Sequence, residues 1–330
     1  MQVVTGATGF VGNALVRALL AQDVPGVVAL VGPSRRTESL AGLEVKTLEA
    51  DMRSFDSLLC AFQGAEVVYH TAGLVSIRTG GLRRLLAANV EGTRNVLRAC
   101  RAAKVGRLIY TSSVHALLEP PVGACLDETV PVDPAGVRGP YAQSKAEATR
   151  LVLSAAWEGL DTVVVFPSGI IGPYDFRPSY AGRFILDCAR GRLKAYVDGA
   201  YNFVDVRDVA KGLISAAGKG RTGQGYILAG HKVSVADLIR AIEHLTGVPG
   251  PRWRIPFRLA RAAGTLMPAY YWASRRQPLF TTYSLDVIAS NCTMISCKAQ
   301  RELGFCPRPL QETLKDTIDW LKEAGKICLQ

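Results

Sequence analysis

A glycine-rich turn near the N-terminus constrains the fold of this chain more than any other feature. The sequence TGATGFVG places Gly6, Gly9 and Gly12 within one turn. An apolar segment at residues 2–5 precedes the turn, and residues 10–20 carry apolar side chains at the period of an amphipathic helix. A strand, a glycine turn and a helix in this order are typical of the phosphate-binding start of a dinucleotide fold. The turn therefore predicts a β-α-β unit whose helix N-terminus faces phosphate groups.

Strand-like and helix-like segments alternate through the first half of the chain. Short apolar runs separated by amphipathic segments are typical of parallel sheets with helices on both faces. The alternation predicts an α/β fold with a doubly wound parallel sheet, the Rossmann fold. We expect strands at residues 2–5, 27–31, 43–48, 65–70, 107–110 and 162–166, and helices at residues 10–20, 82–101 and 141–157.

The alternation stops after Pro167. Residues 201–206 and 225–229 have an extended pattern, and from Ser234 onward the chain is mostly helical, with interruptions at prolines. We therefore expect two domains. Residues 1–166, with return segments near 201–230, form the Rossmann domain, and residues 167–200 and 231–330 form a smaller, mainly helical, substrate-binding cap.

The composition argues against several classes of protein. With 330 residues, 48% of them hydrophobic, the chain can bury a large core. It has no run of about 18 apolar residues and no visible secretory signal, so we expect a cytoplasmic protein. The eight cysteines and four histidines do not cluster, so no metal site is expected. The net charge of +11 is spread along the chain without a nucleic-acid-binding motif, so we expect a small-molecule partner; a homodimer stays open.

Tyr141 and Lys145 stand four residues apart at the start of a predicted helix. This spacing places both side chains on one helix face. A phenol has a pKa of about 10, and a nearby ammonium lowers that pKa toward the range useful for proton transfer. Ser113 follows the strand at 107–110, at the sheet edge where ligands bind in such folds. The three residues predict general acid–base chemistry carried by Tyr141.

Taken together, these motifs resemble the extended short-chain dehydrogenase/reductase superfamily, also called the NAD-dependent epimerase/dehydratase family. The resemblance rests on the GxxGxxG spacing and the YxxxK motif, and it runs through most of the chain. It implies that Ser113 polarises the substrate, Tyr141 is the general acid/base, Lys145 holds the nicotinamide ribose and Asn89 supports a proton relay. It also implies a dinucleotide site made of Gly6, Thr8, Gly9, Phe10, Val11, Gly12, Ser34, Arg35, Asp51, Met52, Thr71, Ala72, Gly73, Thr111, Tyr141, Lys145, Pro167, Ser168 and Ile170.

The end of the second strand bears on the choice of dinucleotide. NAD-preferring sites usually place an Asp or Glu there, which accepts hydrogen bonds from the ribose hydroxyls. This chain instead has Gly32, Pro33, Ser34, Arg35 and Arg36. A serine and a guanidinium suit a 2′-phosphate, whereas a carboxylate repels it. We therefore expect NADP(H) to be favoured, with NAD(H) as the alternative.

Two departures from the sugar-nucleotide enzymes of this superfamily narrow the expected chemistry. The asparagine usual in the stretch before Gly172-Pro173 is missing, and residues 201–206 lack the arginine that grips a diphosphate. The chain therefore resembles most closely the dihydroflavonol 4-reductase and 3β-hydroxysteroid dehydrogenase branch. That resemblance implies interconversion of a ketone or aldehyde with an alcohol on a lipophilic cyclic or aromatic molecule.

An apolar stretch in the predicted cap suits such a substrate. It contains Leu259, Leu266, Met267, Tyr270, Tyr271 and Trp272, and arginines on either side of it also permit peripheral contact with a membrane surface. Ordinary core packing of the cap explains the same pattern equally well. Two other functions stay open: a nucleotide-sugar epimerase or dehydratase, and a non-catalytic NADP-binding regulator.

Overall fold

The computed structural model describes the chain apart from residues 35–36, 77–79, 122–123, 263–281, 291 and 329–330. Its centre is a seven-stranded sheet in the order β11-β7-β5-β4-β1-β2-β3. Every pairing in this sheet is parallel, which confirms the doubly wound fold. The strands are β1 (Gln2–Thr5), β2 (Val27–Val31), β3 (Lys46–Glu49), β4 (Val67–His70), β5 (Arg107–Thr111), β7 (Thr162–Pro167) and β11 (Gly225–Leu228).

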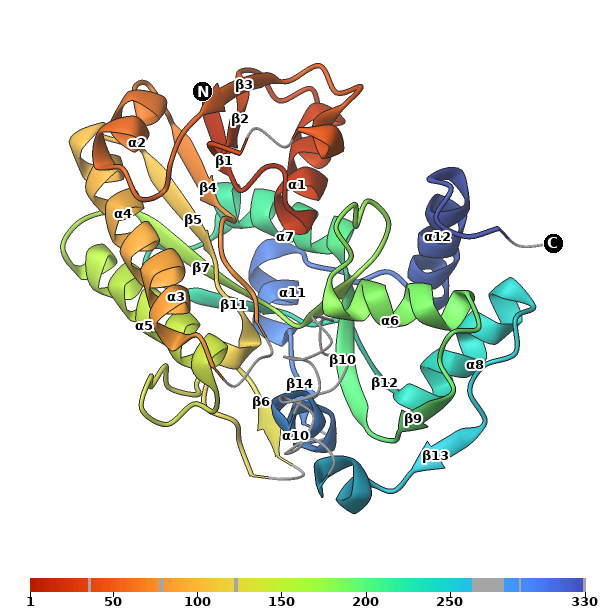
Figure 1. Ribbon diagram of the computed structural model, residues 1–330. Helices are drawn as coiled ribbons and strands as arrows, with labels where there is room; N and C mark the ends of the chain where they lie inside the picture. The colour runs from red at the N-terminus through yellow and green to blue at the C-terminus, as the bar shows by residue number, and fades with distance from the viewer. Residues whose placement is uncertain (35–36, 77–79, 122–123, 263–281, 291, 329–330) are drawn as a thin grey trace.

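Helices cover both faces of this sheet (Figure 1). Successive strand residues alternate between the two faces: Val3 packs on one side and Val4 on the other, and both are fully buried. Strands buried on both faces explain the continuous apolar runs in the sequence. One face carries α2 (Phe55–Phe62), α4 (Gly92–Ala102) and α5 (Pro140–Trp157), and the other carries α1 (Phe10–Leu20), α7 (Val206–Lys219) and α11 (Cys297–Leu303).

The helix expected at residues 82–101 is not uniform. It consists of α3 (Leu82–Leu85), a π-helical turn η2 (Leu86–Glu91) and α4. A π turn inserts an extra residue into a helix, and such turns are frequent at functional sites. Here the turn carries Asn89, one of the predicted catalytic residues.

A smaller lobe lies to one side of the large sheet (Figure 1). Its centre is a three-stranded sheet, β12-β10-β8, in which β10 is parallel to β8 and antiparallel to β12. Ile185, Ile239 and Ile318 form part of the apolar core beneath it. The lobe contains β8 (Gly169–Ile171), α6 (Tyr180–Ala189), β10 (Ala200–Asp205), β12 (His231–Ser234), α8 (Val235–Thr246) and α12 (Leu310–Glu323).

Short elements complete the chain. The strand β9 (Ala195–Val197) pairs with β13 (Trp253–Ile255), and β6 (Cys125–Leu126) pairs with β14 (Thr293–Met294). The others are the 3₁₀ turns η1 (Glu38–Leu40) and η3 (Val114–Ala116) and the helix α10 (Thr282–Ser290). The cap thus has more strand than the sequence pattern indicated. In addition α11, which we expected in the cap, packs on the large sheet through Ala299 and Leu303.

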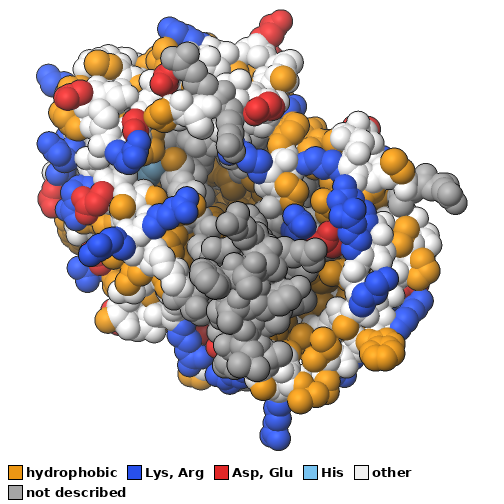
Figure 2. Space-filling model, viewed as in Figure 1, with side chains coloured by type: hydrophobic (Ala, Val, Ile, Leu, Met, Phe, Trp, Pro, Cys, Tyr) orange, Lys and Arg blue, Asp and Glu red, His pale blue; other side chains and the backbone are white. Residues whose placement is uncertain are grey.

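Several surface and side-chain features bear on the classes of protein considered above. Lys and Arg side chains are scattered over the visible face among hydrophobic and acidic ones, without a single basic patch that covers it (Figure 2). All eight cysteines are free thiols. Across the described ranges, no three His, Cys, Asp or Glu side chains group closely enough to hold a metal ion. A membrane-crossing helix, both long and apolar enough, is also absent from the part of the chain that the structure describes.

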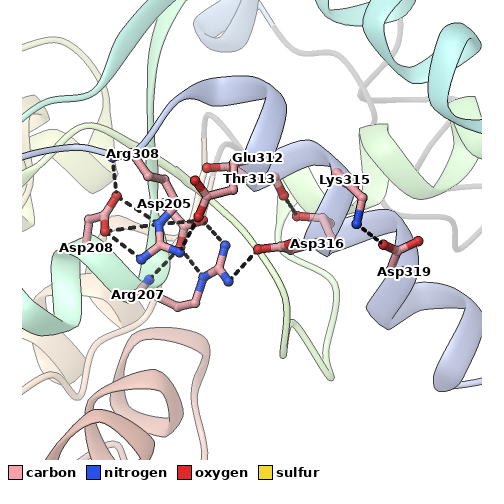
Figure 3. A network of polar contacts seen from close by, with 10 residues as sticks. Asp205, Arg207, Asp208, Arg308, Glu312, Thr313, Lys315, Asp316 and Asp319 are labelled. Carbon is pink, nitrogen blue, oxygen red and sulfur yellow. Dashed lines mark hydrogen bonds and ion pairs between the residues drawn. The ribbon is translucent and has the colours of Figure 1, made fainter.

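A network of ion pairs joins the two lobes (Figure 3). Asp205 ends β10 and caps α7, and its fully buried carboxylate accepts hydrogen bonds from the Arg207 backbone (2.7 Å) and side chain (2.7 Å). Arg207 also reaches Asp316 on α12 (2.6 Å). Arg308, which precedes α12, pairs with Asp208 of α7 at 2.8 Å and with Asp205 at 3.5 Å. The network therefore fixes α12 of the small lobe to α7 of the large one.

We expect Arg308→Met to lower the free energy of unfolding by about 2 to 3 kcal/mol, because it leaves the buried Asp208 carboxylate without a charged partner. The Arg308 side chain is only 15% exposed, so water cannot fully take the place of its hydrogen bonds to the carboxylate. Urea unfolding measures the change. Arg301→Met removes an arginine that is 70% exposed and should change stability by less than about 0.5 kcal/mol. Equal stabilities of the two variants would contradict this account.

Candidate functional site

The glycine turn packs against a second turn at the carboxyl edge of the sheet. Gly6 has a φ of +68°, and a Cβ added to it would lie 2.7 Å from the backbone of Ala72. A Cβ on Gly12 would lie 2.2 Å from the carbonyl oxygen of Gly6. Gly9 precedes α1 without a side-chain cap, so the first N–H groups of the helix keep their capacity to bind an anion. The turn has the form that a dinucleotide diphosphate requires.

Hydrogen bonds to Thr5 of β1 hold the second turn, residues 71–73, in place. The Thr71 hydroxyl donates to the Thr5 carbonyl (2.6 Å), and the Ala72 N–H donates to the Thr5 hydroxyl (3.3 Å). The His70 ring joins that hydroxyl (2.8 Å) to the hydroxyl of Thr93 (3.1 Å). Burial, and secondarily the charge of Lys145, lower the pKa of His70 to about 3, so this ring is a neutral structural bridge.

Two of the predicted cofactor residues have buried hydroxyl oxygens without a partner among the described residues. They are Thr111 Oγ1, at the end of β5, and Ser168 Oγ, just after β7. Both residues are less than a tenth exposed, and burying an unpaired hydroxyl costs about 1 to 3 kcal/mol. Orphaned hydroxyls at the carboxyl edge of the sheet fit a polar ligand bound there. The residues at this edge thus fit a nicotinamide dinucleotide.

The other predicted cofactor residues lie on several separate elements of the fold. The Asp51 carboxylate binds Arg53 at 2.7 Å, and this hydrogen bond lowers its pKa. Met52 packs against the core of the sheet, and Ser34 is exposed beyond β2. Arg35 lies outside the described residues. Phe10 and Val11 form the first turn of α1, Pro167 ends β7 and Ile170 lies in β8.

Ser113, Tyr141 and Lys145 come together beside this edge. Ser113 lies two residues beyond the end of β5 and caps η3, and a hydrogen bond joins it to the Tyr141 phenol. Burial raises the pKa of Tyr141 to about 12, and the hydrogen bond with Ser113 lowers it by less. The lowered pKa expected for Tyr141 is therefore not found in the protein alone. Its phenol is held protonated.

Lys145 is buried, and its ammonium group is directed toward the end of β5. Its Nζ donates to the Thr111 carbonyl (2.7 Å) and to the Tyr110 hydroxyl (3.0 Å). Burial lowers the pKa of Lys145 to about 7. A Cβ on Gly73 would lie 3.9 Å from this Nζ, so the predicted cofactor turn borders the lysine.

Asn89 has a connecting role in the structure. Its side-chain oxygen accepts from the Leu74 N–H (2.7 Å), and its amide donates to the Leu74 carbonyl and the Ser144 hydroxyl (both 3.0 Å). The π turn directs this side chain between the 71–74 turn and α5. Asn89 thus fixes the distance between the predicted cofactor turn and the helix that carries Tyr141 and Lys145.

A cavity of about 580 Å³ is lined by Ala142, which follows Tyr141 in α5, and by His115. Its lining is mostly apolar and includes Val114, Leu118, Ala142, Phe257 and Met294. Of the predicted apolar stretch, Leu259 is 63% exposed, and Leu266, Met267, Tyr270, Tyr271 and Trp272 lie outside the described residues.

Two residues that the sequence analysis missed also line the cavity: His115 and Tyr201. His115 Nε2 lies 3.0 Å from the Tyr201 hydroxyl, and the two rings stack with 10° between their planes. The His115 ring also meets the Tyr141 ring edge-on, with 6.2 Å between the ring centroids. Burial lowers the pKa of His115 to about 4, so the pair presents neutral polar groups to the cavity. The sequence offered a signal for His115, because this residue follows the predicted catalytic Ser113 by two positions on the same turn.

Comparison with known proteins identifies the family. Residues 2–229 match the NAD dependent epimerase/dehydratase family. The chain belongs to this family. A sterol demethylase protein B from Methylococcus capsulatus is 38% identical, over 98% of this chain and 99% of that protein. A 4-hydroxy-2-methyl-3-oxo-4-farnesyl-3,4-dihydroquinoline-1-oxide ketoreductase from Stigmatella aurantiaca is 30% identical, over 98% and 96%.

The predicted branch of the superfamily is also confirmed. A 3beta-hydroxysteroid-dehydrogenase/decarboxylase from Arabidopsis thaliana is 31% identical, over 96% of this chain and 78% of that protein. Among solved structures, that of gox2253 has a TM-score of 0.87 and 33% identity, with 99% of both chains covered.

The buried lysine predicts an unusual pH dependence of stability. Between pH 7 and 10.5 the unfolded chain keeps a proton on Lys145 that the folded chain has released, so this group contributes stability that rises with pH. In urea unfolding without dinucleotide, wild type should therefore gain stability relative to Lys145→Met as the pH rises through this range. The exposed Lys211→Met controls for the loss of one charge. A constant difference between wild type and Lys145→Met would contradict the burial argument.

Proposed function

We propose that this chain is an NAD(P)-dependent oxidoreductase that interconverts a ketone or aldehyde and an alcohol on a lipophilic cyclic or aromatic molecule. One observation carries the proposal: a mostly apolar cavity of about 580 Å³ is lined by the chain neighbours of Ser113 and Tyr141, namely Val114 and Ala142, and by His115, whose ring meets the Tyr141 ring edge-on. The names of the relatives agree, since they include sterol, hydroxysteroid and dihydroquinoline proteins.

The residues have distinct tasks in this proposal. The glycine turn and Lys145 would hold a reduced nicotinamide dinucleotide, which would supply the hydride for the carbonyl carbon. Tyr141 donates the proton to the carbonyl oxygen, and its raised pKa keeps that proton in place until the oxygen becomes basic. The Ser113 hydroxyl binds the same oxygen and fixes its position. Lys145 would bind the nicotinamide ribose through its Nζ, which the structure directs toward the end of β5. Asn89 holds the two halves of the site at a constant distance.

The alternatives are less well supported. A nucleotide-sugar epimerase needs anchors for a dianionic diphosphate, but residues 201–206 of this chain contain no arginine, and Tyr201 lines the mostly apolar cavity. A non-catalytic regulator has no need for the tyrosine and lysine, and this chain keeps both. The apolar cavity favours the oxidoreductase.

A substrate screen tests the proposal. Polycyclic and aromatic ketones should be reduced with loss of the absorbance of the reduced nicotinamide, and the corresponding alcohols should be oxidised in reverse. UDP-sugars should neither turn over nor compete at micromolar concentration. Tight UDP-sugar binding without turnover of any ketone would overturn the proposal in favour of the epimerase.

Substitution of the three reacting residues separates their roles. Tyr141→Phe should lower kcat by about 10²- to 10⁴-fold with little change in dinucleotide affinity, because only a proton donor is lost. Lys145→Met should weaken dinucleotide binding and kcat together, and Ser113→Ala should give an intermediate loss of kcat alone. If Tyr141→Phe keeps more than about a tenth of wild-type kcat, the proton comes from another group.

We propose further that NADP(H) is preferred. Gly32 follows β2 with nothing within 4 Å of an added Cβ, so Gly32→Asp can introduce the carboxylate that NAD-preferring sites carry. This variant should weaken NADPH binding by about tenfold or more and leave NADH binding equal or tighter. Gly32→Asn is the matched neutral control. Fluorescence titrations measure both, and a wild-type protein that binds NADH more tightly than NADPH would contradict the preference.

A further inference from the structure

An arginine of the small lobe reaches the glycine turn of the large one. The connection between β8 and α6 lies beside α1 (Figure 1). From this connection, Arg177 Nη2 donates to the carbonyl oxygen of Thr8 (3.0 Å) and to the Thr8 hydroxyl (3.3 Å). Thr8 lies between Gly6 and Gly9, in the turn that has the form of a diphosphate site. The guanidinium is therefore held at the mouth of that site.

The connection that carries Arg177 is firmly anchored. The Arg17 guanidinium of α1 lies 4.3 Å from the centre of the Tyr174 ring. The rings of Tyr174 and Phe176 both meet Trp320 edge-on, with centroids 6.2 Å and 5.4 Å away. Lys326 Nζ donates to the carbonyl oxygens of residues 175 (3.1 Å) and 176 (3.0 Å). Contacts with both lobes thus fix the position of Arg177, which lowers the entropy cost of placing its charge.

The charge of Arg177 is available for a ligand. Its side chain is exposed, and within the described parts of the chain no carboxylate lies within ion-pair distance of it. An anchored guanidinium next to backbone N–H groups and a helix N-terminus suits the oxygens of a diphosphate. The orphaned, buried hydroxyls of Thr111 and Ser168 independently indicate a polar ligand along this same edge.

We propose that Arg177 is a diphosphate-binding residue, contributed by the cap to the dinucleotide site. The inference rests on the proposed function, because it takes the dinucleotide as the ligand. The bound diphosphate then contacts both lobes: the glycine turn through backbone N–H groups, and the β8–α6 connection through Arg177. Cofactor binding therefore fastens the cap to the Rossmann domain at the edge where the substrate cavity opens.

Binding measurements without substrate test this. Arg177→Gln should weaken the affinity for NADPH and for ADP-ribose by about tenfold, since each contains the diphosphate. Adenosine, which lacks phosphate, should bind within about twofold of wild type when measured by displacement of NADPH. Arg177→Lys keeps a point charge and should recover part of the loss. Arg192→Gln, which changes an exposed arginine just after α6 in the same lobe, is the matched control and should bind all three ligands like wild type.

A loss that is equal for adenosine and ADP-ribose would overturn the proposal, because it would show a general disturbance of the site. So would unchanged NADPH affinity in Arg177→Gln, or a wild-type protein that binds no dinucleotide. Raising the salt concentration gives a second test. Because salt screens the attraction between Arg177 and the diphosphate, the affinity of wild type for NADPH should fall more steeply with salt than that of Arg177→Gln. A protein that binds the dinucleotide but reduces no ketone would contradict the proposed function while leaving this binding test valid.

Discussion

The close approach of two backbone turns at the carboxyl edge of the sheet is the constraint on which the rest of the site depends. A side chain at Gly12 would meet the Gly6 carbonyl at 2.2 Å, and one at Gly6 would meet Ala72 at 2.7 Å. Only glycine permits this packing. It ties the start of α1 to the end of β4, and β4 is hydrogen-bonded to β5. Through these strands, the glycine turn sets where Thr111, Ser113 and Lys145 stand relative to a bound dinucleotide.

Burial then determines the resting protonation of the reacting groups. It raises the pKa of Tyr141 to about 12 and lowers that of Lys145 to about 7, so both effects favour the neutral forms. A neutral phenol is suited to give a proton to a carbonyl oxygen as negative charge develops there. Removing a proton from an alcohol instead requires the phenolate, which needs additional positive charge nearby. The oxidised nicotinamide carries such a charge. In the proposal, the oxidised cofactor therefore favours the phenolate that alcohol oxidation needs, and the uncharged reduced nicotinamide leaves the neutral phenol that ketone reduction needs.

The sequence predicted the fold closely, because strand and helix periodicity, glycine turns and buried apolar runs are local signals. The positions of the first strands along the chain and of the YxxxK helix followed from them. Contacts between segments far apart in the sequence were harder to predict. Tyr201 is 60 residues from Tyr141 in sequence, and Arg177 is 169 residues from Thr8. Burial of Tyr141 also reverses the pKa shift that its distance from Lys145 along one helix had suggested. Such effects depend on the packed environment and have no signature in spacing.

Isotope transfer tests the central claim most directly. The protein is incubated with an apolar cyclic ketone and reduced nicotinamide dinucleotide deuterated at the carbon that donates hydride. The account predicts one deuterium on the carbinol carbon of the product, one oxidised dinucleotide for each alcohol formed, and loss of both in Tyr141→Phe. Retention of the deuterium by the cofactor, with the ketone unchanged, and epimerisation of a UDP-sugar in a parallel incubation without net oxidation would contradict it.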